Sequence, residues 1–86
     1  MSNNEYLNLL TNYAKASGAF AYVMKRFYDG NGISKKEVMA EYDKLKVAYK
    51  SLEVLKSQYP TDKRLNEIMT IASADFNKAN SDIQNL

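Results

Sequence analysis

Apolar residues recur at helical spacing between Ser34 and Tyr59, with polar residues at most of the remaining positions. The apolar positions step alternately by four and three residues, which places them on one helical face: Val38, Tyr42, Leu45, Tyr49 and Leu52. Ser34 followed by Glu37 forms a capping box, and Pro60 disfavours helical backbone at the residue before it. The pattern therefore predicts an amphipathic helix over residues 35–58.

The first part of the chain predicts a helix over residues 3–28 with a wide apolar face. Ser2 followed by Glu5 forms a second capping box at its start. The apolar side chains cover roughly 200° of a helical wheel, against about 100° for an ordinary surface helix. They are Tyr6, Leu7, Leu9, Leu10, Tyr13, Ala14, Ala16, Phe20, Ala21, Val23, Met24 and Phe27. We therefore expect this helix to be covered from two sides, by two helices of the same chain or in part by a partner chain.

The last part of the chain has the most regular apolar spacing. Its apolar positions step by four and three without interruption, as in a heptad seam: Leu65, Met69, Ala72, Phe76, Ala79, Ile83 and Leu86. Thr61 is the expected N-cap, and Asp62 then falls in the first turn, where it complements the helix dipole. This pattern predicts a helix over residues 62–85.

Two short turns separate the predicted helices. Residues 29–32 read Asp-Gly-Asn-Gly, and glycine and asparagine adopt positive φ at low cost. The second turn lies at residues 59–61. Three helices of similar length joined by short turns predict an all-α fold, an antiparallel up-down-up three-helix bundle in a single domain over residues 1–86. The alternative is a long helical hairpin that is completed by dimerisation, and the wide apolar arc of residues 3–28 keeps it open.

The composition removes several kinds of chemistry. The chain contains no cysteine and no histidine, so it lacks thiolate metal ligands, disulfides and the commonest general base near neutral pH. Residues 29–37 share part of the spacing of an EF-hand calcium loop. With Asn31 and Gly32 in register, however, the first ligand position falls on Phe27, and Glu37 arrives one residue early. A glycine-rich turn followed by a capping box explains the segment better.

Acidic side chains do not form an obvious catalytic pair. Without histidine or cysteine, a hydrolase needs paired carboxylates, a Ser-Lys pair or a metal site made of carboxylates alone. Glu37 and Glu41 lie on one helical face, and Lys44 follows three residues after Glu41, as on a solvated charged surface. We therefore expect no enzymatic activity, no cofactor, no metal ion and no small-molecule substrate.

The basic residues gather around the first turn. Twelve basic against ten acidic residues give a net charge of +2, which is too small to indicate nucleic-acid binding by itself. Lys25 and Arg26 precede the turn, and Lys35 and Lys36 follow it, so an up-down-up bundle places all four at one end. Positive charge in the first turn of a helix costs about 0.3–1 kcal/mol. A nucleic-acid-binding helical module that uses this end is our alternative function.

Apolar residues on the predicted polar faces are the stronger indication of function. Val47 and Val54 lie seven residues apart, opposite the core positions of their helix, and Ala40 extends this line. Tyr22 falls in the polar arc of residues 3–28. Single surface apolar residues are normal, but a line at heptad spacing is typical of a contact with a partner helix. We therefore expect a small non-catalytic helical protein that acts through protein–protein contact or self-association, as an adaptor, inhibitor, small chaperone or assembly component.

The chain shows no targeting or membrane-spanning pattern. Residues 1–10 lack the basic region and apolar run of a signal peptide. The uncharged run over residues 16–24 is far shorter than the about 20 residues that span a bilayer. We therefore expect a soluble, cytoplasmic protein that does not bind membranes. Its size and its Lys-, Asn- and Tyr-rich composition suit a virus- or phage-encoded accessory protein.

Overall fold

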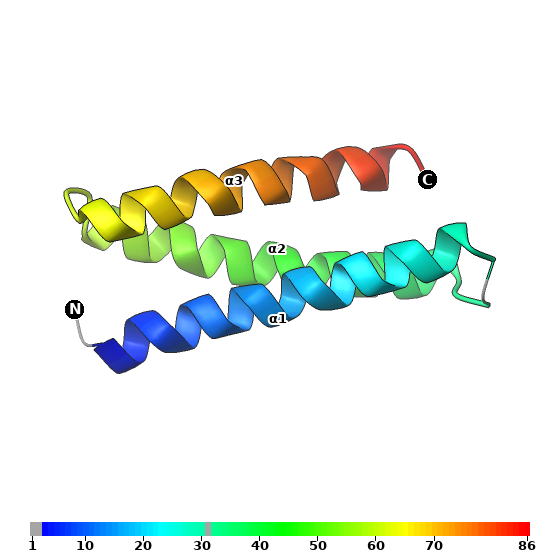
Figure 1. The fold of residues 1–86 in the computed structure, drawn as a ribbon, viewed down its shortest axis with the longest axis horizontal. Coiled ribbons are helices and arrows are strands. Elements are labelled where there is room, and N and C mark those ends of the chain that lie inside the picture. Colours follow the sequence, from blue (N-terminus) through cyan, green and yellow to red (C-terminus); the bar gives the residue numbers. More distant parts are fainter. Residues whose placement is uncertain (1–2, 31) are drawn as a thin grey trace.

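The computed structural model describes residues 3–30 and 32–86 and folds them into three helices. They are α1 (Asn3–Tyr28), α2 (Lys35–Gln58) and α3 (Lys63–Gln84). Figure 1 shows α1 and α3 running in the same direction, with α2 antiparallel to both. No strand occurs in these residues, which confirms the predicted all-α, up-down-up three-helix bundle. Completion by dimerisation and the single domain over residues 1–86 remain predictions.

The helix starts follow local capping signals. At the start of α2 the Ser34 hydroxyl oxygen accepts a hydrogen bond from the Glu37 backbone N–H at 3.2 Å, as predicted. The predicted Thr61 cap of α3 is wrong, because the carboxylate of Asp62 takes this role and accepts from the Leu65 N–H at 2.9 Å. This helix is therefore one residue shorter at each end than predicted. Ser2 of the first predicted capping box lies outside the described residues.

The turn between α1 and α2 depends on two glycines in the left-handed region. Gly30 has φ of 73° and Gly32 has φ of 81°. Residues that carry a Cβ atom rarely adopt such positive φ values. Asn31, which the sequence assigns to the same turn, lies outside the described residues. The reversal of the chain direction therefore requires glycine on both sides of residue 31.

The core runs along the centre of the bundle, draws on all three helices and takes most of its least accessible side chains from α2. Its buried residues are Tyr6, Tyr13, Phe20, Met24, Val38, Tyr42, Leu45, Leu52, Leu55, Leu65, Met69, Ala72 and Ala79. Four of the five least accessible large side chains, Val38, Leu45, Leu52 and Leu55, belong to α2. In the described parts of the chain no charged residue is buried. The middle helix therefore supplies the surface on which the other two pack.

Five aromatic rings, which we call the aromatic series, join all three helices. Phe76 of α3 stacks on Tyr49 and Tyr42 of α2, with ring centroids 4.4 and 5.9 Å apart. Tyr13 of α1 contacts Tyr49 at 6.2 Å, and Phe20 of α1 contacts Tyr42 at 5.8 Å. Such pairs contribute about 0.5–1.5 kcal/mol each beyond the burial of their area. The series therefore fixes the register of α1 and of α3 against α2.

The helices α1 and α3 do not pack directly through their backbones. Each packs closely on α2, but no Cα atom of one lies within 8 Å of a Cα atom of the other. Packed helices have axes about 8–10 Å apart, so these two are further separated. The Cα radius of gyration is 14.0 Å, against about 12 Å for a compact chain of this length. The three helices thus occupy three corners of a four-helix arrangement, with α1 and α3 on a diagonal.

Candidate interaction surfaces

The groove between α1 and α2 consists of two adjoining hollows. Their volumes are about 430 and 260 Å³, and both are lined by Leu9 of α1 and Ser51 of α2. Val47 borders the larger hollow and Val54 the smaller one. No residue of α3 lines either hollow. This groove is therefore a continuous surface of the α1–α2 hairpin alone.

The four residues that the sequence singles out for a partner contact are all exposed, but only two of them share this groove. Val47 is 67% exposed and Val54 is 59% exposed. Ala40 and Tyr22 are also exposed, yet neither lines a hollow of the groove. The Tyr22 hydroxyl instead accepts a hydrogen bond from Arg26 at 2.7 Å, and the guanidinium carbon lies 5.6 Å from the Tyr22 ring centroid. The structure therefore brings Val47 and Val54 together and leaves the other two aside.

The four basic residues of the alternative function lie at one end of the bundle, where α1 ends and α2 begins (Figure 1). Lys25, Lys35 and Lys36 are exposed and form no ion pair within residues 3–30 and 32–86. Arg26 is half-buried and packs over Tyr22. This end therefore presents three exposed cations and one that is held against an aromatic ring.

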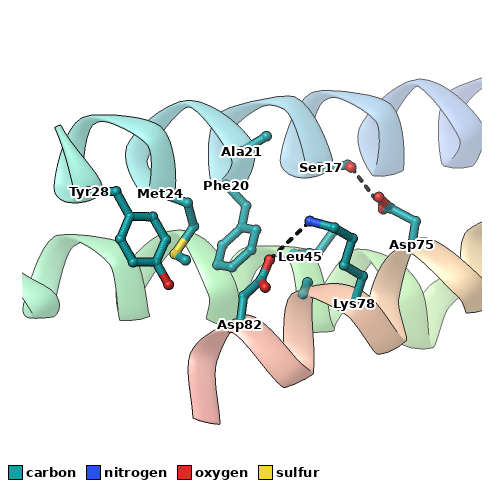
Figure 2. Close-up of a pocket in the computed structure, with 10 residues that line it drawn as sticks. Ser17, Phe20, Ala21, Met24, Tyr28, Leu45, Asp75, Lys78 and Asp82 are labelled. Atoms are coloured by element: carbon teal, nitrogen blue, oxygen red, sulfur yellow. Dashed lines mark hydrogen bonds and ion pairs between the residues drawn. The ribbon is translucent and has the colours of Figure 1, made fainter. Parts of the chain in front are cut away.

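The side between α1 and α3 carries a cleft of about 280 Å³ with an apolar floor and a polar rim. Its floor includes Phe20, Met24, Leu45 and Ala79, which are all buried. Figure 2 shows the α3 side chains that border it: Asp75, Lys78 and Asp82. Lys78 and Asp82 form an ion pair at 3.4 Å, and Tyr28 extends from the end of α1 at the other side. The cleft is the open corner that the separation of α1 from α3 creates.

Direct hydrogen bonds between α1 and α3 converge on one carboxylate. The Tyr13 hydroxyl donates to Oδ2 of Asp75 at 2.6 Å, and the Ser17 hydroxyl donates to the same oxygen at 2.8 Å. The Tyr13 hydroxyl also lies 3.2 Å from the carbonyl oxygen of Ala72. Burial, followed by the hydrogen bond to Asp75, raises the pKa of Tyr13 above its ordinary value. We call this arrangement of Tyr13, Ser17 and Asp75 the polar clasp.

Sequence reasoning missed the exposed edge of α1 along this cleft. Leu7, Ala14, Ala21 and Tyr28 follow one another at seven-residue intervals, and all four are exposed. The first three belong to the wide apolar arc, in which the sequence pattern does not distinguish exposed from buried positions. The buried series Tyr6, Tyr13 and Phe20 has the same spacing, one residue earlier. Two offset heptad series on one helix are the signal that identifies this edge.

The groove between α2 and α3 contains two shallow hollows of about 460 and 700 Å³, and the rings of Tyr42, Tyr49 and Phe76 form the aromatic part of their lining. Lys46 and Lys50 border it on α2, with Asn77 and Asn80 on α3. The Tyr42 hydroxyl donates to the side-chain oxygen of Asn80 at 2.9 Å. Because the rings here stack on one another, this groove offers less free aromatic surface than a stacking platform for nucleic-acid bases requires.

Comparisons with other proteins do not place the chain in a family. No protein-family model matches the chain, and searches among curated proteins and among solved structures found no match. Within the described residues no helix is both long enough and apolar enough to cross a membrane. The same residues contain no group of three acidic side chains placed to hold a metal ion. The function must therefore be argued from the grooves and exposed residues of this chain.

Proposed function

We propose that this chain is a non-catalytic helical module that binds another protein through the α1–α2 groove, as an adaptor, inhibitor, small chaperone or assembly component. The observation that carries this proposal is the exposure of Val47 and Val54 beside two adjoining hollows. Full burial of a valine side chain contributes about 1.5–3 kcal/mol. Because the two side chains are 67% and 59% exposed, a partner that covers both gains about 2–4 kcal/mol in total before the costs of association.

The shape of the groove supports an amphipathic helix as the binding element. The residues of α2 that line the two hollows run from Glu41 to Gln58, about 25 Å along the helix or between four and five helical turns. Ala16 and Ala48 leave the larger hollow room for bulky side chains of a partner. Large apolar residues spaced three and four apart on the partner fit such a groove.

The charges at the rim are nearly balanced. Lys44 forms an ion pair with Glu41 at 3.3 Å beside the larger hollow, and Lys15 is the remaining charged residue there. The exposed setting makes the Lys44–Glu41 pair worth little energetically. Apolar contact rather than charge therefore supplies most of the affinity that we propose for this groove.

The test is selection of binders from a displayed library of amphipathic helical peptides. We expect selected peptides to lose binding when Val47→Glu and Val54→Glu are combined, because both hollows then border a charge that the partner cannot pair. Met39→Glu combined with Ile71→Glu is the matched control, since it adds the same two charges at exposed apolar residues that lie outside this groove. Peptides that bind the double variant as well as the unmodified chain would contradict the proposal.

A second candidate function is nucleic-acid binding through the basic end. It is favoured by the exposure of Lys25, Lys35 and Lys36 without ion pairs in the described chain. Each phosphate contact that is lost reduces the slope of log affinity against log salt by about 0.9 on duplex DNA. We expect Lys35→Glu with Lys36→Glu to reduce retention on a phosphate column and on immobilised DNA.

The matched control for the basic end changes the net charge equally at another place. Lys46→Glu with Lys50→Glu introduces the same charge difference in the α2–α3 groove. An equal loss of retention in both double variants would indicate that retention depends on net charge alone. Unchanged retention of Lys35→Glu with Lys36→Glu would remove the nucleic-acid candidate.

A further inference from the structure

The two hollows between α2 and α3 form one groove, because Tyr49 and Glu53 of α2 line both of them. The α2 wall of this groove runs from Tyr42 to Ser57, about 22 Å at the rise of an α-helix. No residue lines both this groove and the α1–α2 groove. The described chain therefore presents a second elongated surface, separate from the one to which we assign the proposed function.

The charged residues that line the grooves of the bundle are distributed unequally. The α2–α3 groove has three lysines, Lys46, Lys50 and Lys56, against one acidic residue, Glu53. The α1–α2 groove has two basic and two acidic residues, and the α1–α3 cleft has one basic and two acidic residues. Of these three surfaces, the α2–α3 groove is therefore the one whose lining carries an excess of positive charge.

The lysines of the α2–α3 groove are available to a partner. None of the three forms an ion pair within residues 3–30 and 32–86. Lys46 and Lys50 are exposed, and Lys56 is half-buried. Two further acidic residues of these helices, Asp43 and Glu67, are exposed, but neither lines a hollow of the groove. The positive charge inside the groove is thus offset only in part, by Glu53.

The α3 wall of the groove adds neutral hydrogen-bonding groups. Its polar lining residues carry amides and hydroxyls and no charge: Asn66, Thr70, Ser73, Asn77 and Asn80. Two acidic residues of α3, Asp75 and Asp82, instead border the cleft on the α1 side (Figure 2). Amide N–H groups and lysine side chains both donate hydrogen bonds to carboxylates. Both walls therefore favour an anionic partner, α2 through charge and α3 through its amide donors.

The spacing of the lining residues favours an α-helix as the occupant. On α2 they step by four and three residues: Tyr42, Lys46, Tyr49, Glu53 and Lys56. A helix that lies along this wall meets the same spacing on its own surface. An extended segment would need an unpaired strand edge, and both walls of this groove are helices.

We propose that the α2–α3 groove binds an acidic amphipathic helix of another protein. Lys46 and Lys50 lie about 6 Å apart along α2, so two acidic residues three or four positions apart on the partner face them. Glu53 follows one turn later and disfavours a third acidic residue at that level. The partner therefore carries two acidic residues and then a neutral or basic residue on successive turns.

The aromatic rings of the groove provide the apolar part of the contact. Tyr49 and Phe76 are both half-buried, and their rings stack with centroids 4.4 Å apart. The stacking leaves ring edges rather than free faces towards the groove, which suits an aliphatic side chain of a partner helix better than a nucleic-acid base. The proposed partner helix thus places one large apolar residue between its acidic residues and the floor of the groove.

The first experiment measures the binding of fluorescent helical peptides to the full chain by anisotropy. One peptide of about 18 residues, long enough to cover the groove, carries the acidic and apolar pattern on one face. A second peptide has the same composition in scrambled order. We expect the patterned peptide to bind at least about 10-fold more tightly, because the scrambled peptide cannot make the ion pairs and the apolar contact together.

The second experiment repeats the measurement with variants of the chain. Lys46→Glu with Lys50→Glu should weaken binding of the patterned peptide about 10-fold or more, because two attractions become repulsions. The matched control is Lys35→Glu with Lys36→Glu, which changes the net charge equally at exposed lysines of α2 outside the groove. Both variants replace exposed residues, so circular dichroism should report unchanged helix content.

A reversed pair of charges keeps the test independent of any loss of stability. A peptide with lysines in place of its acidic residues should bind the Lys46→Glu with Lys50→Glu variant more tightly than it binds the unmodified chain. Failure of this reversal, or equal weakening of the acidic peptide by both lysine double variants, would overturn the proposal in favour of attraction to net charge alone. No binding of the acidic peptide up to about 1 mM would also overturn it.

Two further measurements separate this groove from the other candidate contacts. Val47→Gln with Val54→Gln alters the α1–α2 groove without changing the net charge and should leave the affinity for the acidic peptide unchanged. A loss of affinity in this variant would assign the peptide to the α1–α2 groove and overturn the present inference, while supporting the proposed function. Single-stranded DNA that binds as tightly as the patterned peptide, and is weakened by the same lysine variant, would identify a general polyanion surface instead of a helix-binding groove.

Discussion

Replacing Tyr13 with phenylalanine removes the hydroxyl that joins α1 to α3 and keeps the ring in the core. The hydroxyl donates to Asp75 at 2.6 Å, whereas the ring contacts Tyr49 with centroids 6.2 Å apart. Asp75 retains the hydrogen bond from Ser17 in this variant. Because α1 and α3 have no close backbone contact, the polar clasp carries much of the direct attachment between them.

The expected loss of unfolding free energy in Tyr13→Phe follows from the charge of the hydrogen-bond acceptor, Asp75, and from its exposure. A hydrogen bond to a charged group contributes about 1.5–3 kcal/mol net, and about 0.5–1.5 kcal/mol is typical of a neutral pair. Asp75 is exposed and is therefore hydrated when the bond is absent, which reduces the loss to about 1–2 kcal/mol. For a domain of this size such a change lowers Tm by about 4–16 °C.

The assay combines urea unfolding with native-state hydrogen exchange. In Tyr13→Phe we expect amides of α3 to lose more protection than amides of α2, since α3 would open without disrupting the α1–α2 hairpin. Tyr42→Phe is the matched control, because it removes a hydrogen bond to the neutral Asn80 between helices that pack directly. A double-mutant cycle with Asp75→Asn should give a coupling energy of about 1 kcal/mol.

The reasoning is refuted if Tyr13→Phe changes the free energy of unfolding by less than about 0.3 kcal/mol, the usual error of additivity. A uniform loss of protection over all three helices would also refute it, since the clasp would then stabilise the whole bundle rather than the attachment of α3.

Two further predictions concern alkaline pH and the glycines. The raised pKa of Tyr13 favours the neutral phenol in the folded state, so stability should be fully present below about pH 10 and fall as pH rises above it, where the unfolded phenol ionises. Urea midpoints between pH 8 and 11 should therefore fall less in Tyr13→Phe, and parallel curves would contradict this. Gly32→Ala should lower Tm, because φ of 81° strains a residue with a Cβ, at a cost of about 1 kcal/mol or more. Gly18→Ala should instead raise Tm, with a gain of about 0.5–1 kcal/mol in the free energy of unfolding, because its helical site has open space. Equal Tm shifts of the two variants in calorimetry would contradict these two predictions.

The helices themselves were predictable from local chemistry. Ser34 with Glu37 marked the start of α2, and the predicted ranges 3–28 and 35–58 agree with the structure. The prediction failed only at α3, where a threonine and an aspartate stood side by side as candidate caps. Asp62 takes the cap because its carboxylate reaches the Leu65 N–H and complements the helix dipole.

The division of the wide apolar arc of α1 was not predictable in the same way. Periodicity shows how much of a helix is apolar, but it does not show which part a neighbour covers. Tyr6 is buried and Leu7 is half-exposed, although they are adjacent and both belong to the arc. Their difference depends on the distance between α1 and α3, which is set by contacts of high sequence separation such as Tyr13 with Asp75. The candidate cleft is therefore a property of the packing, whereas Val47 and Val54 were identifiable from spacing alone.

The aromatic series explains why the corner between α1 and α3 stays open. Phe76 lies nearly parallel to both Tyr42 and Tyr49, with interplanar angles of 6° and 10°, so α3 is centred over these two rings of α2. Tyr13 and Phe20 meet the same two tyrosines from the α1 side. Because two tyrosines of α2 thus receive rings from both neighbours, they hold α1 and α3 on opposite sides. The direct contacts left between α1 and α3 include the polar clasp and Arg64, whose guanidinium carbon lies 5.4 Å from the Tyr6 ring centroid. The exposed edge of α1, formed by Leu7, Ala14, Ala21 and Tyr28, then remains uncovered as a direct consequence of how the core is filled.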